Sequence, residues 1–192
     1  MKPSNHKSHG FGRKPNSLDA YHSAVIHNIR EHGLHVCGVH DPSGNDPNFF
    51  YTIGNSYHAL PSVELFTFWK SDIGGGLLNM VSYQMRTSPE FCEKVFSHEV
   101  SYHWGFLGSY DEVPIALRRV SGLLERVARE KYVCQHDNTV FSRFIKPHQL
   151  IQVVIPDFNN RFPGDPHFDQ DLLDTIPEFL QIPYDPEVYS VG

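Results

Sequence analysis

Apolar residues near the start of the chain recur at the spacing of a helix. The stripe consists of Leu18, Tyr21, Val25 and Ile29. Residues three or four positions apart share one face of a helix, so this pattern predicts an amphipathic helix. We expect it to begin at Asn16 or Ser17, either of which can cap the first turn, and to end at Gly33.

The pattern then changes to one that is typical of β-strands. Residues 34–39 alternate between two faces, and residues 49–53 are rich in aromatic and β-branched side chains. Between them, residues 41–47 consist entirely of turn-forming Asp, Pro, Ser, Gly and Asn. We therefore expect the two strands to pair as a hairpin.

A third β-prone run covers residues 63–69. In a regular strand, Glu64 shares a face with Phe66 and Phe68. A carboxylate on an aromatic face is poorly hydrated, which raises its pKa and suits it to general acid or base chemistry. The alternative is that Glu64 stands at the start of the strand and points to water.

Helical and β-like runs are mixed in the rest of the chain. Ser71 or Asp72 can cap a helix that carries Ile73, Leu77, Met80 and Val81. We also expect strands at 95–106, 113–120 and 150–155 and a helix at 123–132. The last strand is apolar on both faces, which is typical of a central strand. Without a repeating βαβ order, the mixture predicts an α+β fold with a mostly antiparallel sheet flanked by a few helices.

Three consecutive glycines, Gly74–Gly76, fall in the first turn of the helix that follows Ser71 and Asp72. Each glycine weakens a helix by up to about 1 kcal/mol relative to alanine, so the run needs an explanation. Backbone amides at a helix start can bind an anion, but the run lacks the Lys-Ser/Thr of a P-loop and the spacing of a dinucleotide fingerprint. We favour close packing of the helix or a distorted first turn.

The chain length of 192 residues fits one domain with a sizeable core. We expect a flexible basic tail at residues 1–15, a folded domain at 16–180 and a C-terminal tail at 181–192. The formal charge is −6, from 16 Lys and Arg against 22 Asp and Glu. This balance argues against nucleic acid as a partner, because phosphate binding depends on clustered basic residues.

The cysteines and the apolar runs indicate where the protein resides. Three cysteines without CxxC spacing fit a reducing compartment better than a disulfide framework. The N-terminus lacks the apolar region of a signal peptide, and no run is long enough to span a membrane. We expect a soluble, cytoplasmic protein without a membrane segment.

The main candidate site combines polar residues from two distant stretches. In the rear stretch, residues 151–166 run from an apolar strand into a proline-rich turn. Glu64, Asp157 and His58 are the candidate catalytic residues. The candidate ligand-binding residues are Tyr51, Thr52, Arg161 and Asp165, with Arg161 holding a phosphate or carboxylate through two parallel hydrogen bonds.

A structural interpretation competes with this site. Asp157 and Asp165 stand in a turn, where carboxylates commonly accept backbone N–H bonds. Arg161 then bridges the loop as an ion pair. The two interpretations differ in whether Arg161 is available to a ligand.

Metal binding and nucleophilic catalysis have weaker patterns, and we expect neither a metal nor a cofactor. His32 and His35 are separated by the helix-breaking Gly33, and His35 and His40 should face opposite sides of a strand. Cys37 fits a buried core residue better than a nucleophile, because the chain has no Gly-x-Ser-x-Gly elbow and no converging base.

Four ordered pieces of the chain resemble the DUF4262 family, a set of bacterial proteins known only as a domain of unknown function. The pieces are His32–Val36, Phe50–Gly54, His58–Pro61 with Val63–Leu65, and Gln152–Asp157 leading to Arg161–Pro163 and Asp165–Pro166. The resemblance covers roughly Ala24 to Asp171 and implies one compact α+β domain. The chain departs from the family pattern at Leu34, Ile155, Asn160 and Gly164, which suggests a divergent member.

Two functions fit these patterns. The first is binding of a small anionic ligand, with hydrolysis as an extension, in a polar cleft between the two stretches. The second is a non-catalytic interaction module, of the kind found among bacterial accessory or immunity proteins, that binds a protein partner through its acidic surface. The residues leave open whether the protein is an enzyme.

Overall fold

The computed structural model of the chain describes most of the region from the first helix to the proline-rich turn. The described residues are 18–40, 42–43, 48–58, 62–68, 73–97, 101–107, 112–131, 149–163, 165–169 and 171. The tails predicted at 1–15 and 181–192 lie outside the described residues, and the domain boundaries stay predictions.

Helices and strands alternate irregularly along the chain. Their order is α1 (Leu18–His32), β1 (His35–Val39), β2 (Phe49–Ile53), α2 (Asn55–His58), β3 (Val63–Thr67), α3 (Ile73–Thr87), α4 (Pro89–Ser97), β4 (Ser101–Leu107), β5 (Glu112–Val120), α5 (Gly122–Lys131) and β6 (Gln149–Val154). None of the described helices is long and apolar enough to cross a membrane.

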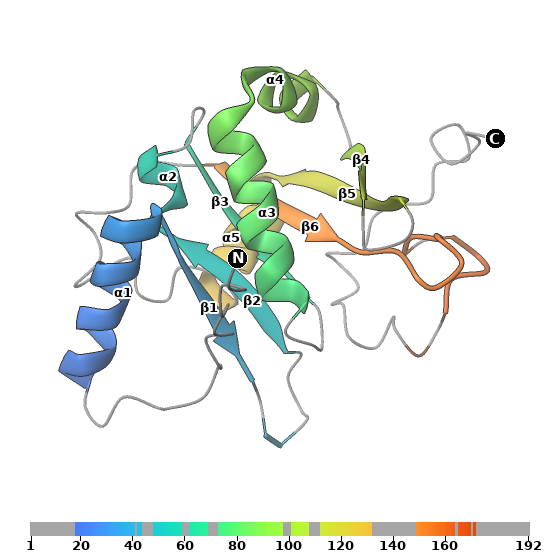
Figure 1. Ribbon diagram of the computed structural model, residues 1–192. Coiled ribbons are helices and arrows are strands. Elements are labelled where there is room, and N and C mark those ends of the chain that lie inside the picture. The colour runs from blue at the N-terminus through green and yellow to red at the C-terminus, as the bar shows by residue number, and fades with distance from the viewer. Residues whose placement is uncertain are drawn as a thin grey trace, which may run out of the picture.

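The strands form one six-stranded sheet in the order β1-β2-β3-β6-β5-β4 (Figure 1). Four of its five pairings are antiparallel, and only β3 and β6, at the centre, run parallel. The predicted α+β fold with a mostly antiparallel sheet is therefore confirmed. The parallel pair matters for the site, because the same ends of β3 and β6 lie at the same edge of the sheet.

The first helix ends and the hairpin forms as the sequence predicts, whereas the caps predicted at Asn16 and Ser17 lie outside the described residues. Gly33 has a φ of 83°, and its N–H donates to the carbonyl of Ile29 at 2.9 Å, which closes α1. Strands β1 and β2 then pair antiparallel in a register from His35 opposite Ile53 to Val39 opposite Phe49. This hairpin forms one edge of the sheet.

Strand β6 is central, as its apolar pattern predicts. It lies between β3 and β5, and residues 150–154 are all buried. A strand covered on both faces is mostly apolar on both, and Gln152 is the buried polar residue between Ile151 and Val153.

Helices cover both faces of the sheet, with α3 in front and α5 behind in Figure 1. On one face, α1 and α5 contribute Val25, Ile29 and Ala128 to a core that also contains Cys37, Tyr51, Phe66 and Leu150. On the other, α3 and α4 pack Leu77, Leu78, Val81, Met85, Phe91 and Val95 against Leu65, Ile115 and Ile151. The two cores give each side of the sheet its own set of buried residues.

The strand predicted at 95–106 is wrong in its first part. Residues 95–97 are the end of helix α4, residues 101–107 form strand β4, and residues 98–100 lie outside the described residues. The helix begins at Pro89, and the Ser88 hydroxyl caps it by accepting the N–H of Phe91 at 3.2 Å. Phe91, Cys92 and Val95 lie buried on one helical face.

Close packing accounts for the first glycine of the Gly74–Gly76 run. A Cβ atom at Gly74 would lie 2.8 Å from Cδ2 of Phe50 and 3.3 Å from Cγ2 of Thr67. Helix α3 therefore approaches β2 and β3 more closely than a side chain at this position allows. At Gly76 a Cβ atom would meet nothing within 4 Å.

Candidate functional site

The Glu64 side chain is completely buried, with no exposed surface, at the start of β3. The prediction that it shares a face with Phe66 holds, because both Phe66 and Phe68 belong to the core between the sheet and helices α1 and α5. The alternative that Glu64 points to water is wrong. A carboxylate in this position requires hydrogen-bond donors.

Three donors reach the Glu64 carboxylate from β2 and the turn after it. Oε1 accepts the N–H of Gly54 at 3.0 Å and the N–H of Ser56 at 2.9 Å. Oε2 accepts the hydroxyl of Thr52 at 2.5 Å. We call these four residues the Glu64 cluster.

The cluster replaces part of the backbone ladder between β2 and β3. Residue pairing between these strands is confined to Phe50 with Thr67 and Tyr51 with Phe66. Beyond it, the Thr52 hydroxyl accepts the N–H of Leu65 at 2.8 Å, in place of a carbonyl. Side chains therefore continue the connection between the strands where the backbone of β2 turns away into α2.

Gly54 makes this turn possible. Its φ is 90°, a conformation that residues with a side chain rarely adopt, and its N–H points at Glu64 as a result. Asn55 adds a second link, because its side-chain amide donates to the carbonyl of Val63 at 3.0 Å. Helix α2 is thus attached to the start of β3 by two side chains.

Burial raises the pKa of Glu64 to about 7, although the hydrogen bonds from Thr52, Ser56 and Gly54 each oppose this shift. None of the ion pairs among the described residues includes Glu64. The charged carboxylate is therefore stabilised by dipoles alone, which offsets only part of its lost hydration.

Tyr51 lies in the core beside the cluster, with 3% of its surface exposed. Its neighbour across the hairpin is Cys37, whose sulfur lies 3.3 Å from the Tyr21 hydroxyl. Burial raises the pKa of the Cys37 thiol to about 11, against hydrogen bonds from Tyr21 and Tyr51. A neutral thiol at physiological pH matches the prediction of a buried core cysteine rather than a nucleophile.

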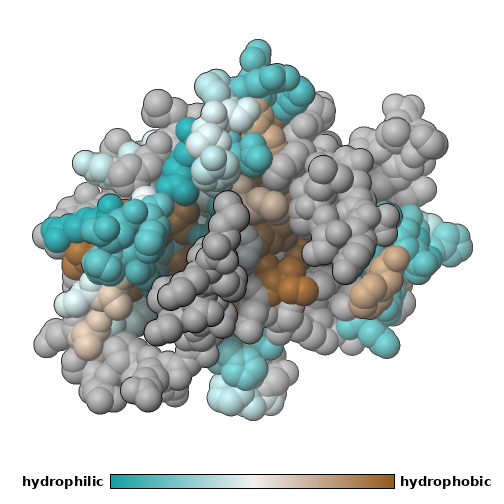
Figure 2. Space-filling model, viewed as in Figure 1, coloured by the Kyte–Doolittle hydropathy of each residue, from teal (hydrophilic) through white to brown (hydrophobic). Residues whose placement is uncertain are grey.

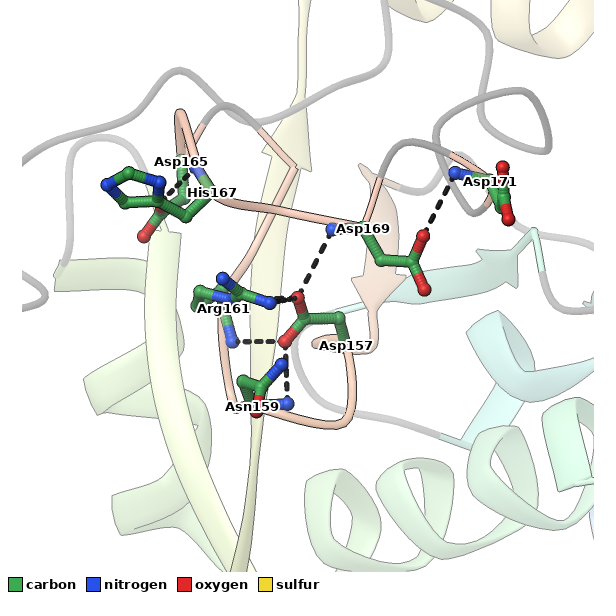
Figure 3. Close-up of polar contacts among 7 residues, drawn as sticks. All are labelled: Asp157, Asn159, Arg161, Asp165, His167, Asp169 and Asp171. Atoms are coloured by element: carbon green, nitrogen blue, oxygen red, sulfur yellow. Dashed lines mark hydrogen bonds and ion pairs between the residues drawn. The ribbon is translucent and has the colours of Figure 1, made fainter.

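The rear stretch forms a compact loop around Asp157 (Figure 3). Oδ1 of Asp157 accepts the N–H groups of Asn159 at 2.8 Å and Arg161 at 3.0 Å. Oδ2 accepts the N–H of Asp169 at 3.2 Å. We call residues 157–169 the Asp157 loop.

Arg161 forms an ion pair with the same carboxylate. Its Nε and Nη2 atoms lie 2.9 and 2.8 Å from Oδ2 of Asp157. Burial on its own would raise the pKa of Asp157, but the bonds from Arg161, Asn159 and Asp169 outweigh it and lower the pKa. Arg161 thus bridges its own loop as an ion pair, and its availability to a ligand stays a prediction.

The other carboxylates of the loop also bond locally. Asp165 accepts the N–H of His167 at 2.8 Å, and Asp169 accepts the N–H of Asp171 at 3.0 Å (Figure 3). Each is a two-residue turn of the kind that Asp commonly forms. Asp165 therefore stabilises the loop in which it stands.

The structure does not bring the front and rear candidates into one cleft. Glu64 pairs in register with Leu150, near the start of β6. Val154, which ends β6, lies about 13 Å further along the strand at about 3.3 Å per residue, and the Asp157 loop follows it. Figure 1 accordingly shows α2 and the orange loop at opposite ends of the sheet. His58 ends α2, and its side chain lies outside the described residues.

The histidines of the first segment bond to asparagines. Nδ1 of His35 lies 2.8 Å from the Asn28 side chain, and burial lowers the pKa of His35 to about 4. His40 pairs with Asn48 at 2.7 Å. Within the described ranges, no three His, Cys, Asp or Glu side chains are placed to hold a metal ion. The predicted lack of a metal or cofactor stays a prediction.

Phe158 is an exposed residue that sequence reasoning missed. It is 94% exposed and directly follows Asp157. The surface over this loop is otherwise largely hydrophilic (Figure 2). The available signal was an aromatic residue inside a turn of Asp, Asn and Pro, where no helical or strand periodicity gives it a buried partner.

Comparison with known proteins supports one family. A family model described as "Domain of unknown function (DUF4262)" matches residues 28–169. The chain belongs to the DUF4262 family. The match to DUF4262 extends from within α1 to the Asp157 loop, so the DUF4262 region contains both candidate clusters. Searches of the curated proteins and of the solved structures found no match.

Proposed function

We propose that this DUF4262 protein is a non-catalytic interaction module that binds a protein partner through the Asp157 loop. The observation that carries the proposal is the 94% exposure of Phe158 on that loop. Aromatic side chains supply much of the binding energy at protein interfaces when they enter a pocket of the partner. A phenylalanine side chain is apolar and is poorly hydrated when exposed. Its exposure therefore favours a role in binding.

The hydrogen bonds beneath Phe158 support this function. Asp157 and Arg161 also bond through their backbones, with the N–H of Asp157 2.8 Å from the carbonyl of Arg161. Asn160 has a φ of 58°, and its N–H donates to the carbonyl of Asp157 at 3.0 Å. A loop fixed in this way loses little conformational entropy on binding, so more of the contact energy contributes to affinity.

The acidic groups favour binding over catalysis. Asp157 already accepts bonds from Asn159, Arg161 and Asp169, and its lowered pKa makes it a weak base. Glu64 has the pKa of a useful base, but it is fully buried at the far end of the sheet.

A quantitative capture experiment tests the proposal. The protein and its Phe158→Ser variant are immobilised, exposed to lysate of the native host, and compared by mass spectrometry. Tyr83→Ser is the matched control, because Tyr83 is 59% exposed but lies on α3. We expect a stoichiometric partner that the Tyr83 variant retains and the Phe158 variant loses. Capture that is unchanged by Phe158→Ser contradicts the proposal.

A second candidate function is binding of a small anionic ligand by Arg161. The ion pair with Asp157 uses Nε and Nη2, and Nη1 donates no hydrogen bond within the described residues. The Arg161 side chain is 30% exposed, so part of it is accessible to a ligand. The three backbone N–H bonds to Asp157 share in neutralising its carboxylate, which leaves part of the guanidinium charge for a ligand.

Titration with inorganic phosphate and with acetate tests this second function. We expect saturable shifts of the backbone amide signals of the Asp157 loop that are lost in Arg161→Gln and kept in a control variant, Arg30→Gln, which changes an exposed arginine of α1. Shifts that rise linearly without saturation argue against a site. The hydrolytic extension has less support, because Glu64 lies away from Arg161.

A further inference from the structure

The Glu64 cluster is a buried acid site that the proposed partner binding does not use. Its carboxylate has no exposed surface and accepts bonds from two backbone amides and one hydroxyl. Most fully buried acids in proteins are paired with a cation. None of the donors to Glu64 in the described part of the chain carries a charge.

We propose that Glu64 is a reversible proton-binding site that couples the stability of the fold to pH near neutrality. The geometry permits both protonation states. In the charged state, Thr52 donates its hydroxyl hydrogen to Oε2 at 2.5 Å. In the neutral state, a proton taken from solvent resides on Oε2 and is donated to the oxygen of Thr52.

The Thr52 hydroxyl has a second acceptor to use in the neutral state. The carbonyl of Leu65 lies 3.5 Å from its oxygen, at the limit of a hydrogen bond. The hydroxyl oxygen can accept bonds from both the Leu65 N–H and the Glu64 proton, because it has two lone pairs. Proton uptake therefore adds one hydrogen and reverses the direction of the hydrogen bond between Thr52 and Glu64. Oε1 still accepts the N–H groups of Gly54 and Ser56.

The other titratable groups near the cluster do not interfere in this pH range. Cys37 faces it from β1, and burial holds its pKa at about 11. Tyr21 of α1 bonds to Cys37, and burial raises its pKa further above the ordinary value for tyrosine. Tyr51 contributes a phenol from β2. From α2, Tyr57 is 46% exposed, and the His58 side chain lies outside the described residues.

The direction of the coupling follows from the shift. The folded state binds the proton up to a pH of about 7, whereas an unfolded glutamate loses it near a pH of about 4.3. Stability from Glu64 is thus fully present below the lower value and is lost as pH rises through the upper one. We expect the folding equilibrium constant to fall by about a hundredfold from this group between these limits.

Denaturant unfolding of the protein and of Glu64→Gln between pH 5 and pH 8 tests the proposal, a range of about three units around the expected midpoint. Glutamine copies the neutral acid, since its oxygen can accept Gly54 and Ser56 while its amide donates to Thr52. The matched control is Glu93→Gln, which changes an exposed acid of α4. We expect the folding constant of the native protein, divided by that of Glu64→Gln, to drop by about a hundredfold as pH rises. The folding constant of the native protein divided by that of Glu93→Gln should stay constant.

Carbon-13 NMR of the native protein labelled at glutamate Cδ provides a readout that does not depend on a variant folding. We expect one glutamate signal to titrate near neutral pH. A set of glutamate signals that all titrate below a pH of about 5 overturns the proposal, as does a parallel pH dependence of the native and Glu64→Gln proteins.

Discussion

Replacing Gly54 by alanine tests how the Glu64 cluster is built. The new Cβ would lie 2.9 Å from both Cγ1 and Cγ2 of Ile29 and 3.1 Å from its Cδ1. Ile29 is 1% exposed and cannot move aside into solvent. The left-handed backbone costs about 1–2 kcal/mol for a residue with a side chain, and overpacking costs a further ~1–3 kcal/mol. We expect a loss of about 2–5 kcal/mol in the free energy of unfolding.

The two contributions can be separated by repeating the change in an Ile29→Ala background. Alanine removes all three atoms that the new Cβ would meet, so only the backbone cost of Gly54→Ala remains there. Ile29→Ala itself costs about 2–5 kcal/mol in the free energy of unfolding. In this double-mutant cycle, Gly54→Ala should cost about 1–3 kcal/mol less in the Ile29→Ala background than in the native protein. Urea unfolding followed by circular dichroism measures each value. A cost below about 1 kcal/mol, or the same cost in both backgrounds, refutes the packing argument.

Two further substitutions test the packing of α3 and the loop after β6. Gly74→Ala should destabilise by about 1–3 kcal/mol because its Cβ meets Phe50, whereas Gly76→Ala, with open space, should stabilise by up to about 1 kcal/mol. Equal effects on thermal unfolding would show that α3 does not pack as described. Asp157→Asn should cost about 2–3 kcal/mol near neutral pH, because its new amide faces the Arg161 and Asp169 donors. Since the pKa of Asp157 is lowered, its stabilisation is present above the unfolded pKa and is lost as pH falls through the folded one. The gap between the two proteins in urea unfolding should therefore close in acid, and a constant gap contradicts the ion-pair account.

The elements that sequence could predict are those whose signals are local. Helix α1 has an apolar stripe and a glycine at its end, and β6 is apolar on both faces. Helix α4 was missed because the aromatic alternation of the strand after it extended the predicted strand too far back. Its own start signal, Ser88 followed by Pro89, was present in the sequence.

The candidate site was predictable in parts and not as a whole. The burial of Glu64 follows from strand alternation, and the Asp157–Arg161 pair follows from turn chemistry within five residues. Whether the two groups meet depends on strand order, which the local pattern does not contain. The parallel pairing of β3 with β6 places Glu64 at one end of the sheet and the Asp157 loop beyond the other.

The contrast between the two buried carboxylates shows what separates a titrating acid from a structural one. Both Glu64 and Asp157 accept backbone N–H bonds from a neighbouring turn, and burial on its own would raise the pKa of each. The pKa of Asp157 nevertheless ends below its ordinary value, because a guanidinium joins three backbone donors. Glu64 has two such donors and a hydroxyl but no cation, so burial prevails. Hydrogen bonds from Arg161, Asn159 and Asp169 therefore outweigh burial at Asp157, whereas at Glu64, which has no cationic donor, burial prevails and leaves a group that can exchange a proton.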